Sequence, residues 1–184
     1  MQHCSPARMH GMRKPRLLQD GALYHVTARA NRKEMILDSC SMKEPFLEVL
    51  CRARKKFDFR LDNFCIMGNH IHLMIRPDGH TNLSRLMQWI MSVFAMAFNR
   101  IHGLVGHVWG GRFFSRIVSS LWEYLKTFRY IDENPVEAQQ VVNRRDWRYG
   151  GLWHHRAGMA DVCAKLAVFA EGAFPEHYVL LLPE

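Results

Sequence analysis

The sequence predicts an α+β domain with a ferredoxin-like β-α-β-β-α-β core, in which a four-stranded antiparallel sheet carries two helices on one face. Three observations support this fold class. Short runs alternate apolar and polar residues with a period of two, and longer runs repeat apolar residues at helical spacing. The third observation is the order of these runs, which adds one more helix and a C-terminal extension after the core.

Four segments have the alternation and the β-branched or aromatic residues typical of strands. In chain order they are Ala22–Ala30, Phe59–Met67, His70–Arg76 and Arg112–Ser119. Within the first, His25 and Arg29 share one face because alternate residues of a strand point the same way. Gly68-Asn69 separates the second segment from the third, which predicts a hairpin. A crossover helix keeps the first two strands apart and leaves room for another strand between them.

Three longer segments have apolar residues at helical spacing, namely Ser41–Phe57, Thr81–His102 and Leu121–Glu133. Ser39 and Ser41 are both candidate N-caps for the first helix. We expect the third helix to end at Asn134-Pro135, since a proline disfavours helical backbone in the residue before it. A further helix is expected near Ala160–Ala170.

The bulk composition narrows the partner and the compartment. The formal net charge is +8 and the pI is about 9.5, which favours a polyanionic partner, although solubility alone is a competing explanation. Five cysteines with no CxxC pair argue against a disulfide framework or a structural zinc finger, and favour reduced thiols. No run has the length of a transmembrane helix, and no apolar signal segment follows the basic N-terminus. We therefore expect a cytoplasmic protein without a membrane partner.

The triplet His70-Ile71-His72 is a candidate metal-binding motif. On a strand, His70 and His72 project to one face while Ile71 projects to the other. Two neighbouring imidazoles can chelate a divalent cation. A pair of ordinary surface histidines is the competing interpretation, because the chain contains 11 histidines.

A third ligand and a nucleophile are expected on the helix that follows the sheet. Tyr130 and Asn134 are four residues apart and therefore share one helical face. The amide oxygen of Asn134 could complete a metal site, while Tyr130 could act as a covalent nucleophile. Lys126, one turn earlier, could contact a phosphate. Each also has an ordinary interpretation, as an amphipathic helix residue, a turn residue beside Pro135 or an exposed lysine.

Three runs of the sequence resemble the HUH single-tyrosine transposases. They are ALYHVTARANR (Ala22–Arg32), FCIMGNHIHLMIRP (Phe64–Pro77) and FRYIDENPVEA (Phe128–Ala138). Each run alone is a weak signal, and the three together in this order are a strong one. The resemblance spans roughly residues 13–140, and the branch that it resembles most is the REP-associated tyrosine transposases, which act on palindromic repeats.

The resemblance implies a metal-dependent endonuclease and strand-transferase that acts on single-stranded DNA at hairpin or repeat sequences. It implies that His70, His72 and Asn134 bind a divalent ion, Mg²⁺ or Mn²⁺. It also implies that Tyr130 attacks the scissile phosphate and forms a 5′-phosphotyrosine intermediate. Mobile-element members commonly have glutamine where this chain has the shorter Asn134, so a water-bridged contact is an alternative. Imidazole ligands also suit zinc, so the ligands alone do not select the metal.

Basic, polar and aromatic residues are candidate contacts for single-stranded or hairpin DNA. The basic and polar candidates lie in the N-terminal arm, after the first strand, in the fourth strand and on the last helix of the core: Arg13, Lys14, Arg16, Arg29, Asn31, Arg32, Lys33, Arg112, Arg116 and Lys126. Trp109, Phe113 and Trp153 are candidates for base stacking. Packing or solvated surface is the competing interpretation for each. No role is predicted for His102, His107, His154 and His155.

We expect residues 1–140 to form the catalytic domain with its basic N-terminal arm, and residues 141–184 to extend the same domain. Two other functions compete with the enzyme. A non-cleaving DNA-binding protein or regulator of repeat sequences could keep the fold, but it has no chemical need for His70, His72 and Tyr130. An RNA-binding ferredoxin-like module would place exposed aromatics where this sheet has histidines. A monomer and a homodimer are both compatible with the resemblance.

Overall fold

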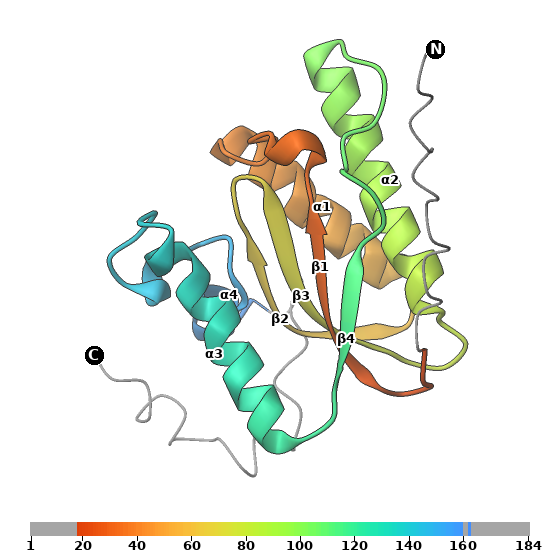
Figure 1. The fold of residues 1–184 in the computed structure, drawn as a ribbon, viewed down its shortest axis with the longest axis vertical. Helices are drawn as coiled ribbons and strands as arrows, with labels where there is room; N and C mark the ends of the chain where they lie inside the picture. The colour runs from red at the N-terminus through yellow and green to blue at the C-terminus, as the bar shows by residue number, and fades with distance from the viewer. Residues whose placement is uncertain (1–17, 160–161, 163–184) are drawn as a thin grey trace, which may run out of the picture.

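The computed structural model describes residues 18–159 and residue 162, and within this part four strands form one antiparallel sheet in the order β2-β3-β1-β4 (Figure 1). The strands are β1 (Leu23–Arg29), β2 (Phe59–Ile66), β3 (His70–Pro77) and β4 (Phe114–Val118). The third strand fills the space between the first two, as the crossover connection predicts. The α+β ferredoxin-like fold class is therefore confirmed.

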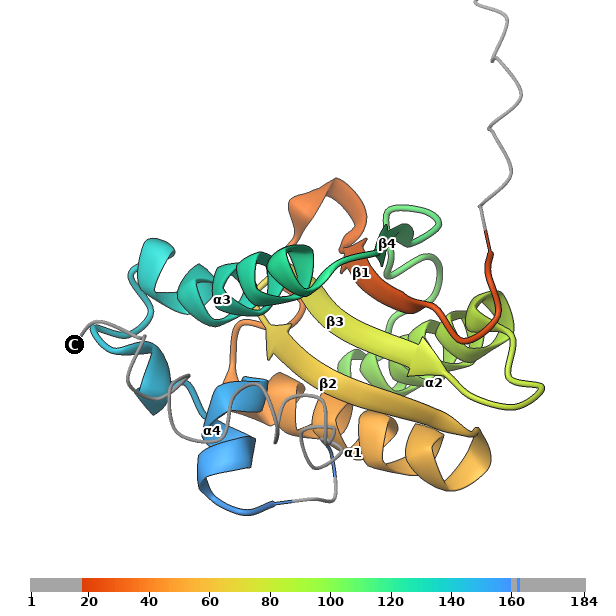
Figure 2. The ribbon, with the colours of Figure 1, turned by 90° about the horizontal axis from the view of Figure 1, so that it is seen from below.

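One face of the sheet carries the apolar core. The helices α1 (Cys40–Lys56) and α2 (Leu83–His102) lie side by side beneath it in Figure 2. Phe46 of α1 and Phe94 of α2 meet edge to face, with ring centroids 5.2 Å apart. From β3, the residues that face these helices are Ile71, Leu73 and Ile75, and all three are completely buried. Burial of this continuous apolar layer is the main driving force for the fold.

The opposite face is covered by α3 (Leu121–Glu137), as Figure 2 shows. A shorter helix, α4 (Gly151–Arg156), lies against β2 at the edge of the sheet. Two 3₁₀ turns complete the described elements, η1 (Asn31–Lys33) after β1 and η2 (Arg144–Asp146) between α3 and α4. No helix in the described part of the chain is long and apolar enough to cross a membrane.

Two of the predicted boundaries that differ from the structure concern the candidate site. The third predicted helix does not stop at Asn134-Pro135 but continues to Glu137. Asn134 and Pro135 are both buried there, so packing against the sheet outweighs the local preference that proline imposes. The fourth strand begins at Phe114 rather than at Arg112, which lies in the preceding loop. Asn134 therefore keeps its place on a helical face, whereas Arg112 is not a strand residue.

Candidate active site

The two histidines of the triplet lie on the face of the sheet that α3 covers. Register pairs His70 with Arg29 and His72 with Thr27 across the β1–β3 ladder. His70 is half-buried and His72 is buried. The two rings meet nearly at right angles, with centroids 5.0 Å apart. Strand alternation thus brings the pair together, as the sequence predicts.

The hairpin turn sets the tautomer of His70. The side-chain amide of Asn69 donates from Nδ2 to the backbone oxygen of Lys33 at 3.2 Å. Its Oδ1 is 2.7 Å from Nδ1 of His70, so that nitrogen carries the proton and donates. The Nε2 atom of His70 then keeps its lone pair, which is the state that a metal ligand requires.

A third histidine orients His72. Nε2 of His25 lies 3.0 Å from Nδ1 of His72, and Oγ1 of Thr27 lies 3.4 Å from the same atom. The rings of His25 and His72 are stacked, with centroids 5.2 Å apart. Nε2 of His72 is buried and has no hydrogen-bond partner within the described residues. A buried nitrogen in that state is one that a metal ion would satisfy.

Burial keeps these imidazoles neutral. Desolvation is the largest cause that lowers the pKa of His72 to about 3, and the charges of His70, His25 and Arg29 add to it. Desolvation followed by the Arg116 guanidinium lowers the pKa of His25 to about 4. The pKa of His70 is lowered by desolvation and then by Arg29. Neutral imidazole binds metals, so protons compete little with a cation at neutral pH.

The helix α3 brings Tyr130 and Asn134 to the histidines. The Tyr130 ring packs edge-on against His72, with centroids 5.4 Å apart. Nδ2 of Asn134 donates to the backbone oxygen of Tyr130 at 2.6 Å, which leaves its Oδ1 to face the sheet. Burial lowers the pKa of His70 and of His72, and the nearby side chain of Asn134 partly offsets this effect at both rings. The amide therefore lies within reach of both rings.

Tyr130 differs from the other tyrosine of α3. Its side chain is 44% exposed, so its hydroxyl is accessible to a polymer substrate. Tyr124 is half-buried, and burial raises its pKa. The environment of Tyr130 is thus compatible with nucleophilic attack, and Tyr124 provides a matched control on the same helix.

Buried polar contacts hold α3 in place over β2. Nδ2 of Asn63 donates to Oδ1 of Asp132 at 2.9 Å and to the backbone oxygen of Phe128 at 3.3 Å. Burial raises the pKa of Asp132 to about 7, against the hydrogen bond from Asn63. A Cβ on Gly151 would lie 2.1 Å from Oδ1 of Asn63, so only glycine lets α4 approach this contact. Sequence periodicity did not predict this clamp, because the three residues lie on separate elements.

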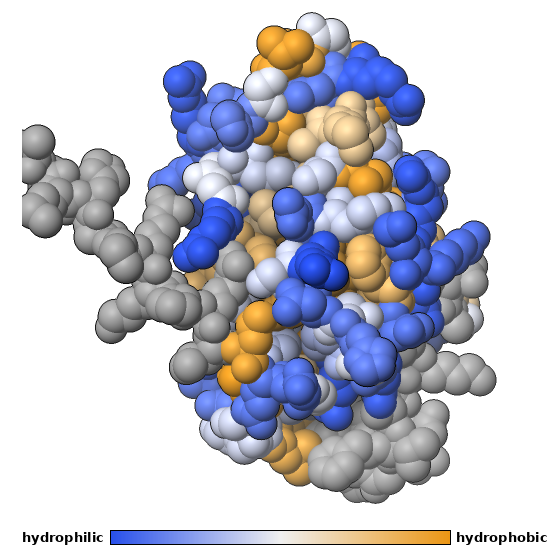
Figure 3. Space-filling view, turned by 90° about the vertical axis from the view of Figure 1, so that its right-hand side faces the viewer, coloured by the Kyte–Doolittle hydropathy of each residue, from blue (hydrophilic) through white to orange (hydrophobic). Residues whose placement is uncertain are grey.

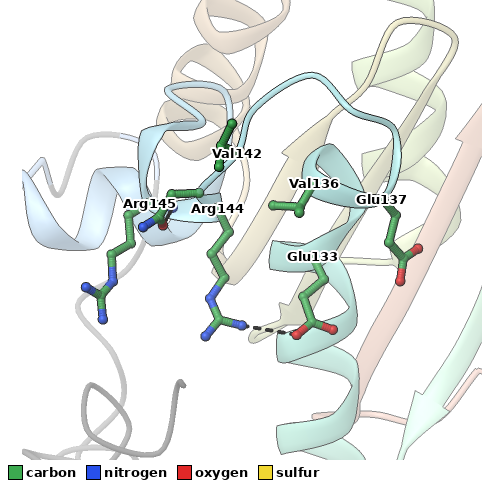
Figure 4. Close-up of a pocket in the computed structure, with 7 residues that line it drawn as sticks. Glu133, Val136, Glu137, Val142, Arg144 and Arg145 are labelled. Atoms are coloured by element: carbon green, nitrogen blue, oxygen red, sulfur yellow. Dashed lines mark hydrogen bonds and ion pairs between the residues drawn. The ribbon is translucent and has the colours of Figure 1, made fainter. Parts of the chain in front are cut away.

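The C-terminal end of α3 is also tied to the segment after it. Figure 4 shows the Arg144 side chain reaching across to Glu133 on the helix. Nη1 of Arg144 lies 3.2 Å from Oε1 of Glu133, and Nε of Arg129 lies 2.7 Å from the same oxygen. These ion pairs connect Glu133 to the preceding turn of α3 and to η2, and the exposed pair with Arg129 is worth little.

Together, these residues present three potential metal donors on one side of Tyr130. They are the Nε2 atoms of His70 and His72 and the Oδ1 atom of Asn134. The described residues contain no cluster of three or more His, Cys, Asp or Glu side chains suited to a metal, so a site here needs the amide as its third protein ligand. Nitrogen and amide oxygen donors suit a divalent cation, and the orphaned His72 nitrogen fits the same role.

The predicted DNA contacts separate into different parts of the surface. Arg29 and Arg32 are exposed near the hairpin, with Asn31 half-buried, and Arg116 and Lys126 line a groove beside Tyr130. Arg112 is exposed on the loop before β4, and Arg13, Lys14 and Arg16 lie outside the described residues. Figure 3 shows that the side of the molecule opposite α3 and α4 in Figure 1 mixes charged and apolar groups without one continuous apolar surface.

The candidates for base stacking are largely wrong. Trp109 and Phe113 are buried, and the indole of Trp109 donates to the backbone oxygen of Met91 at 2.9 Å. Both belong to the core because the glycine-rich loop folds back on α2. Trp153 is half-buried on α4. His154 and His155, for which no role was predicted, dock α4 against the sheet, and Nε2 of His155 is 2.9 Å from the backbone oxygen of Asp62.

His25 is the site residue that sequence reasoning missed. Alternation placed it on the same face as Arg29, but nothing in the sequence related it to the triplet. Only the β1–β3 pairing sets the first strand beside the third and brings His25 to His72. The signal that could have found it is the strand order, which the crossover connection already indicates.

Comparisons with known proteins bear on the family and the fold of the chain. A family model described as IS200-like transposase matches residues 19–134, more than half of the chain. A solved structure of a REP-associated tyrosine transposase bound to a REP hairpin superimposes with a TM-score of 0.68 at 19% identity, covering 79% of this chain and 86% of that one. A putative transposase from Deinococcus radiodurans R1 gives a TM-score of 0.44 at 13% identity, covering 66% and 97%. No curated protein matches the chain.

Proposed function

The chain belongs to the family of IS200-like transposases, and from that premise we propose that it is a metal-dependent endonuclease and strand-transferase of single-stranded DNA. It acts at hairpin or repeat sequences through a 5′-phosphotyrosine on Tyr130. The observation that carries the proposal is the convergence of His70, His72 and Asn134 beside Tyr130. These residues come from two elements that are far apart in the sequence.

The three donors would hold one divalent cation, Mg²⁺ or Mn²⁺. Bound there, the cation supplies Lewis acidity to a phosphate oxygen and orients the phosphate. Asn69 and His25 act through the ligands rather than on the substrate. They hold the protons on Nδ1 of His70 and of His72, so that both Nε2 atoms face the cation site.

Tyr130 performs the covalent step. Its phenolic oxygen attacks the phosphorus and forms a P–O bond as the bond between phosphorus and the 3′ oxygen breaks. The phenolic proton is lost to water, and the departing 3′ oxygen takes up a proton, which leaves a free 3′-hydroxyl and a 5′-phosphotyrosine. The reverse attack by the 3′-hydroxyl of another strand restores Tyr130 and joins DNA. Positively charged Arg29, Arg116 and Lys126 would bind the surrounding phosphates.

We also propose that the chain acts as one domain, with residues 1–140 catalytic and residues 141–184 an extension of it. The contacts of η2 with α3 and of α4 with β2 support this division for the described residues. A hairpin is the proposed substrate because the similarly folded REP-associated transposase is bound to a REP hairpin.

The test is a covalent-adduct assay. The full chain is incubated with Mn²⁺ or Mg²⁺ and a labelled hairpin oligonucleotide that has single-stranded flanks on both sides. We expect a protein–DNA adduct that survives denaturing electrophoresis, disappears with EDTA and disappears in Tyr130→Phe. Tyr124→Phe is the matched control and should keep the adduct, because that side chain is half-buried.

Three results would contradict the proposal. Binding without an adduct under every metal would indicate a non-cleaving DNA-binding protein or regulator on this fold. An adduct that persists in Tyr130→Phe would assign the nucleophile to another residue. Equal preference for RNA hairpins would favour an RNA-binding module instead.

A further inference from the structure

Trp122 is an exposed aromatic side chain that packing does not explain. It lies in the first turn of α3 and is 73% exposed. The other described tryptophans are buried or half-buried, and Trp109 and Trp147 belong to the core. Leaving an indole in water forgoes the stabilisation that its large apolar area would give on burial. The exposure of this ring therefore favours a role in binding rather than in packing.

The indole stands at one end of a groove that leads to the nucleophile. The groove has a volume of about 580 Å³ and is lined by His25, Arg116, Trp122, Glu123, Lys126, Thr127 and Tyr130. Three of these residues, at positions 122, 126 and 130, follow one another at a spacing of four along α3. Residues at that spacing share a helical face, so the groove has an aromatic ring at each end and a lysine between them.

The charges of the groove suit a phosphodiester backbone. Arg116 reaches from β4 to α3, where its Nη2 donates to Oγ1 of Thr127 at 3.1 Å, and Lys126 is exposed beside it. Glu123 is the single carboxylate in the lining, and its Oε2 accepts from the backbone nitrogen and the hydroxyl of Ser119 at 2.8 and 2.9 Å. It caps the start of the helix and is thereby held toward Ser119. The cationic side chains of Arg116 and Lys126 and the indole of Trp122 therefore remain to contact a ligand.

We propose that Trp122 is the stacking platform for an unpaired base of the single-stranded DNA whose phosphate lies at Tyr130. Stacking on an aromatic ring beside a cationic groove is how proteins hold single strands without reading their sequence. The inference rests on the proposed function, since it takes Tyr130 as the reacting residue. It adds a binding subsite that neither the triplet nor Asn134 provides.

The spacing limits which base can occupy this subsite. Eight residues of helix at 1.5 Å each set Trp122 about 12 Å from Tyr130 along the axis. That distance corresponds to about three or four nucleotides at the 3.4 Å spacing of stacked bases, and to fewer in an extended strand. The stacked base is therefore within about four nucleotides of the scissile phosphate.

Binding measured without chemistry tests the subsite. The parent protein is Tyr130→Phe, studied in EDTA at one fixed salt concentration, with a fluorescent hairpin oligonucleotide that has single-stranded flanks. Adding Trp122→Ala should weaken binding by about 5- to 150-fold, the range for loss of one stacked base. Trp122→Phe should recover most of the affinity. Trp122→Leu should not, because leucine keeps apolar area but has no ring.

An abasic scan of the flanks locates the base. Replacing one nucleotide at a time by an abasic site should reproduce the loss at a position within about four nucleotides of the cleavage site. At that position, the loss of affinity caused by the abasic site should not add to the loss of affinity caused by Trp122→Ala. Leu121→Ala is the matched control, because Leu121 is a neighbouring exposed residue, 44% exposed, that is absent from the groove lining. It should leave affinity unchanged.

Any of three results would overturn the inference: unchanged affinity in Trp122→Ala, full affinity in Trp122→Leu, or strictly additive losses of affinity in the abasic scan. The same holds if the parent protein binds flanked and blunt hairpins equally. The affinity measurements need no cleavage, and only the distance from the stacked base to the scissile phosphate is read against the cleavage site of the wild-type protein. If the wild-type protein forms the adduct while Trp122→Ala binds normally, the subsite is wrong and the function stands. If the subsite behaves as expected but no metal yields an adduct, the proposed function is wrong and the subsite stands.

Discussion

The two faces of the sheet follow different rules. Toward α1 and α2 the buried strand side chains are apolar, and Ile71, Leu73 and Ile75 are fully covered. Toward α3 the same sheet buries polar groups, among them His25, His72 and Asn63. Nε2 of His72 and Oδ2 of Asp132 have no hydrogen-bond partner in the part of the chain described. A buried polar atom in that state costs about 1–3 kcal/mol.

This contrast indicates that the apolar face stabilises the fold, while the α3 face carries the proposed site. The apolar face supplies the burial that holds the domain together. The α3 face lowers stability locally and keeps neutral imidazoles, an amide and an accessible phenol in one place. Strained or unsatisfied groups of this kind are expected where a site must be preorganised. Variants that act on one face but not on the other test this division.

The largest expected contrast is between two adjacent residues of β3. Ile71→Ala should lower the free energy of unfolding by about 2–5 kcal/mol, because it leaves a cavity in the apolar layer. In metal-free protein, His72→Ala should lower it by less than half as much, since the substitution also removes an unsatisfied buried nitrogen. Urea unfolding in EDTA measures both. Equal losses would show that the α3 face contributes to stability as the other face does.

A methyl group added beneath α3 is expected to have the next largest effect. Gly151→Ala should cost about 1–3 kcal/mol, because the new Cβ would lie 2.1 Å from Oδ1 of Asn63 and break the clamp to Asp132. Gly68→Ala is the control, since its Cβ would meet the flexible end of the exposed Met35 side chain. Thermal unfolding should separate the two variants, and a harmless Gly151→Ala would mean that α4 is not closely packed on the clamp.

Removal of His25, the hydrogen-bond partner of the proposed metal ligand His72, should weaken metal binding without abolishing it. His25→Ala removes the partner of Nδ1 of His72, and loss of such a contact typically reduces metal affinity by about 10- to 100-fold. Titration of metal-free protein with Mn²⁺, followed by calorimetry or electron paramagnetic resonance, measures this directly. His25→Gln, whose amide oxygen can accept the same hydrogen bond, should recover part of the affinity. Unchanged binding in His25→Ala would remove the orienting role.

The smallest expected effect is a fall in the free energy of unfolding at acidic pH. The pKa values of His72 and His25 fall from 6.5 in the unfolded chain to about 3 and about 4 in the folded one. The unfolded state therefore binds more protons below pH 6.5, and the stability contribution present above that pH is lost as pH falls toward 4. Each histidine adds a slope of at most about 1.4 kcal/mol per pH unit.

The comparison must be made between variants, because the raised pKa of Asp132 gives a slope of the opposite sign. Urea midpoints at pH 5, 6 and 7 in EDTA should vary less with pH in His72→Ala than in the wild-type protein. An identical pH dependence in both would mean that His72 is not held neutral by burial.

Much of this site was predictable from the sequence because it rests on local periodicity. A period of two brings His70 beside His72, and a spacing of four brings Tyr130 above Asn134. Local rules failed where packing opposed them, as at Pro135, which stays within α3. Residue type alone is also a poor guide, since it makes Trp109 and Phe113 candidates for stacking whereas both are core residues. A ring's exposure depends on which elements cover it, and sequence spacing does not contain that information.

Local sequence patterns are enough to predict the fold class, the strand and helix order, and which residues share a face, because each follows from alternation, helical spacing and turn residues within one segment. Three relationships appear only in the folded chain: His25 orients His72, Asn63 and Gly151 hold α3 through Asp132, and Trp122 opens a cationic groove toward Tyr130. Those relationships join segments far apart in the chain. They are set by strand pairing and by packing across the sheet, which no local pattern specifies.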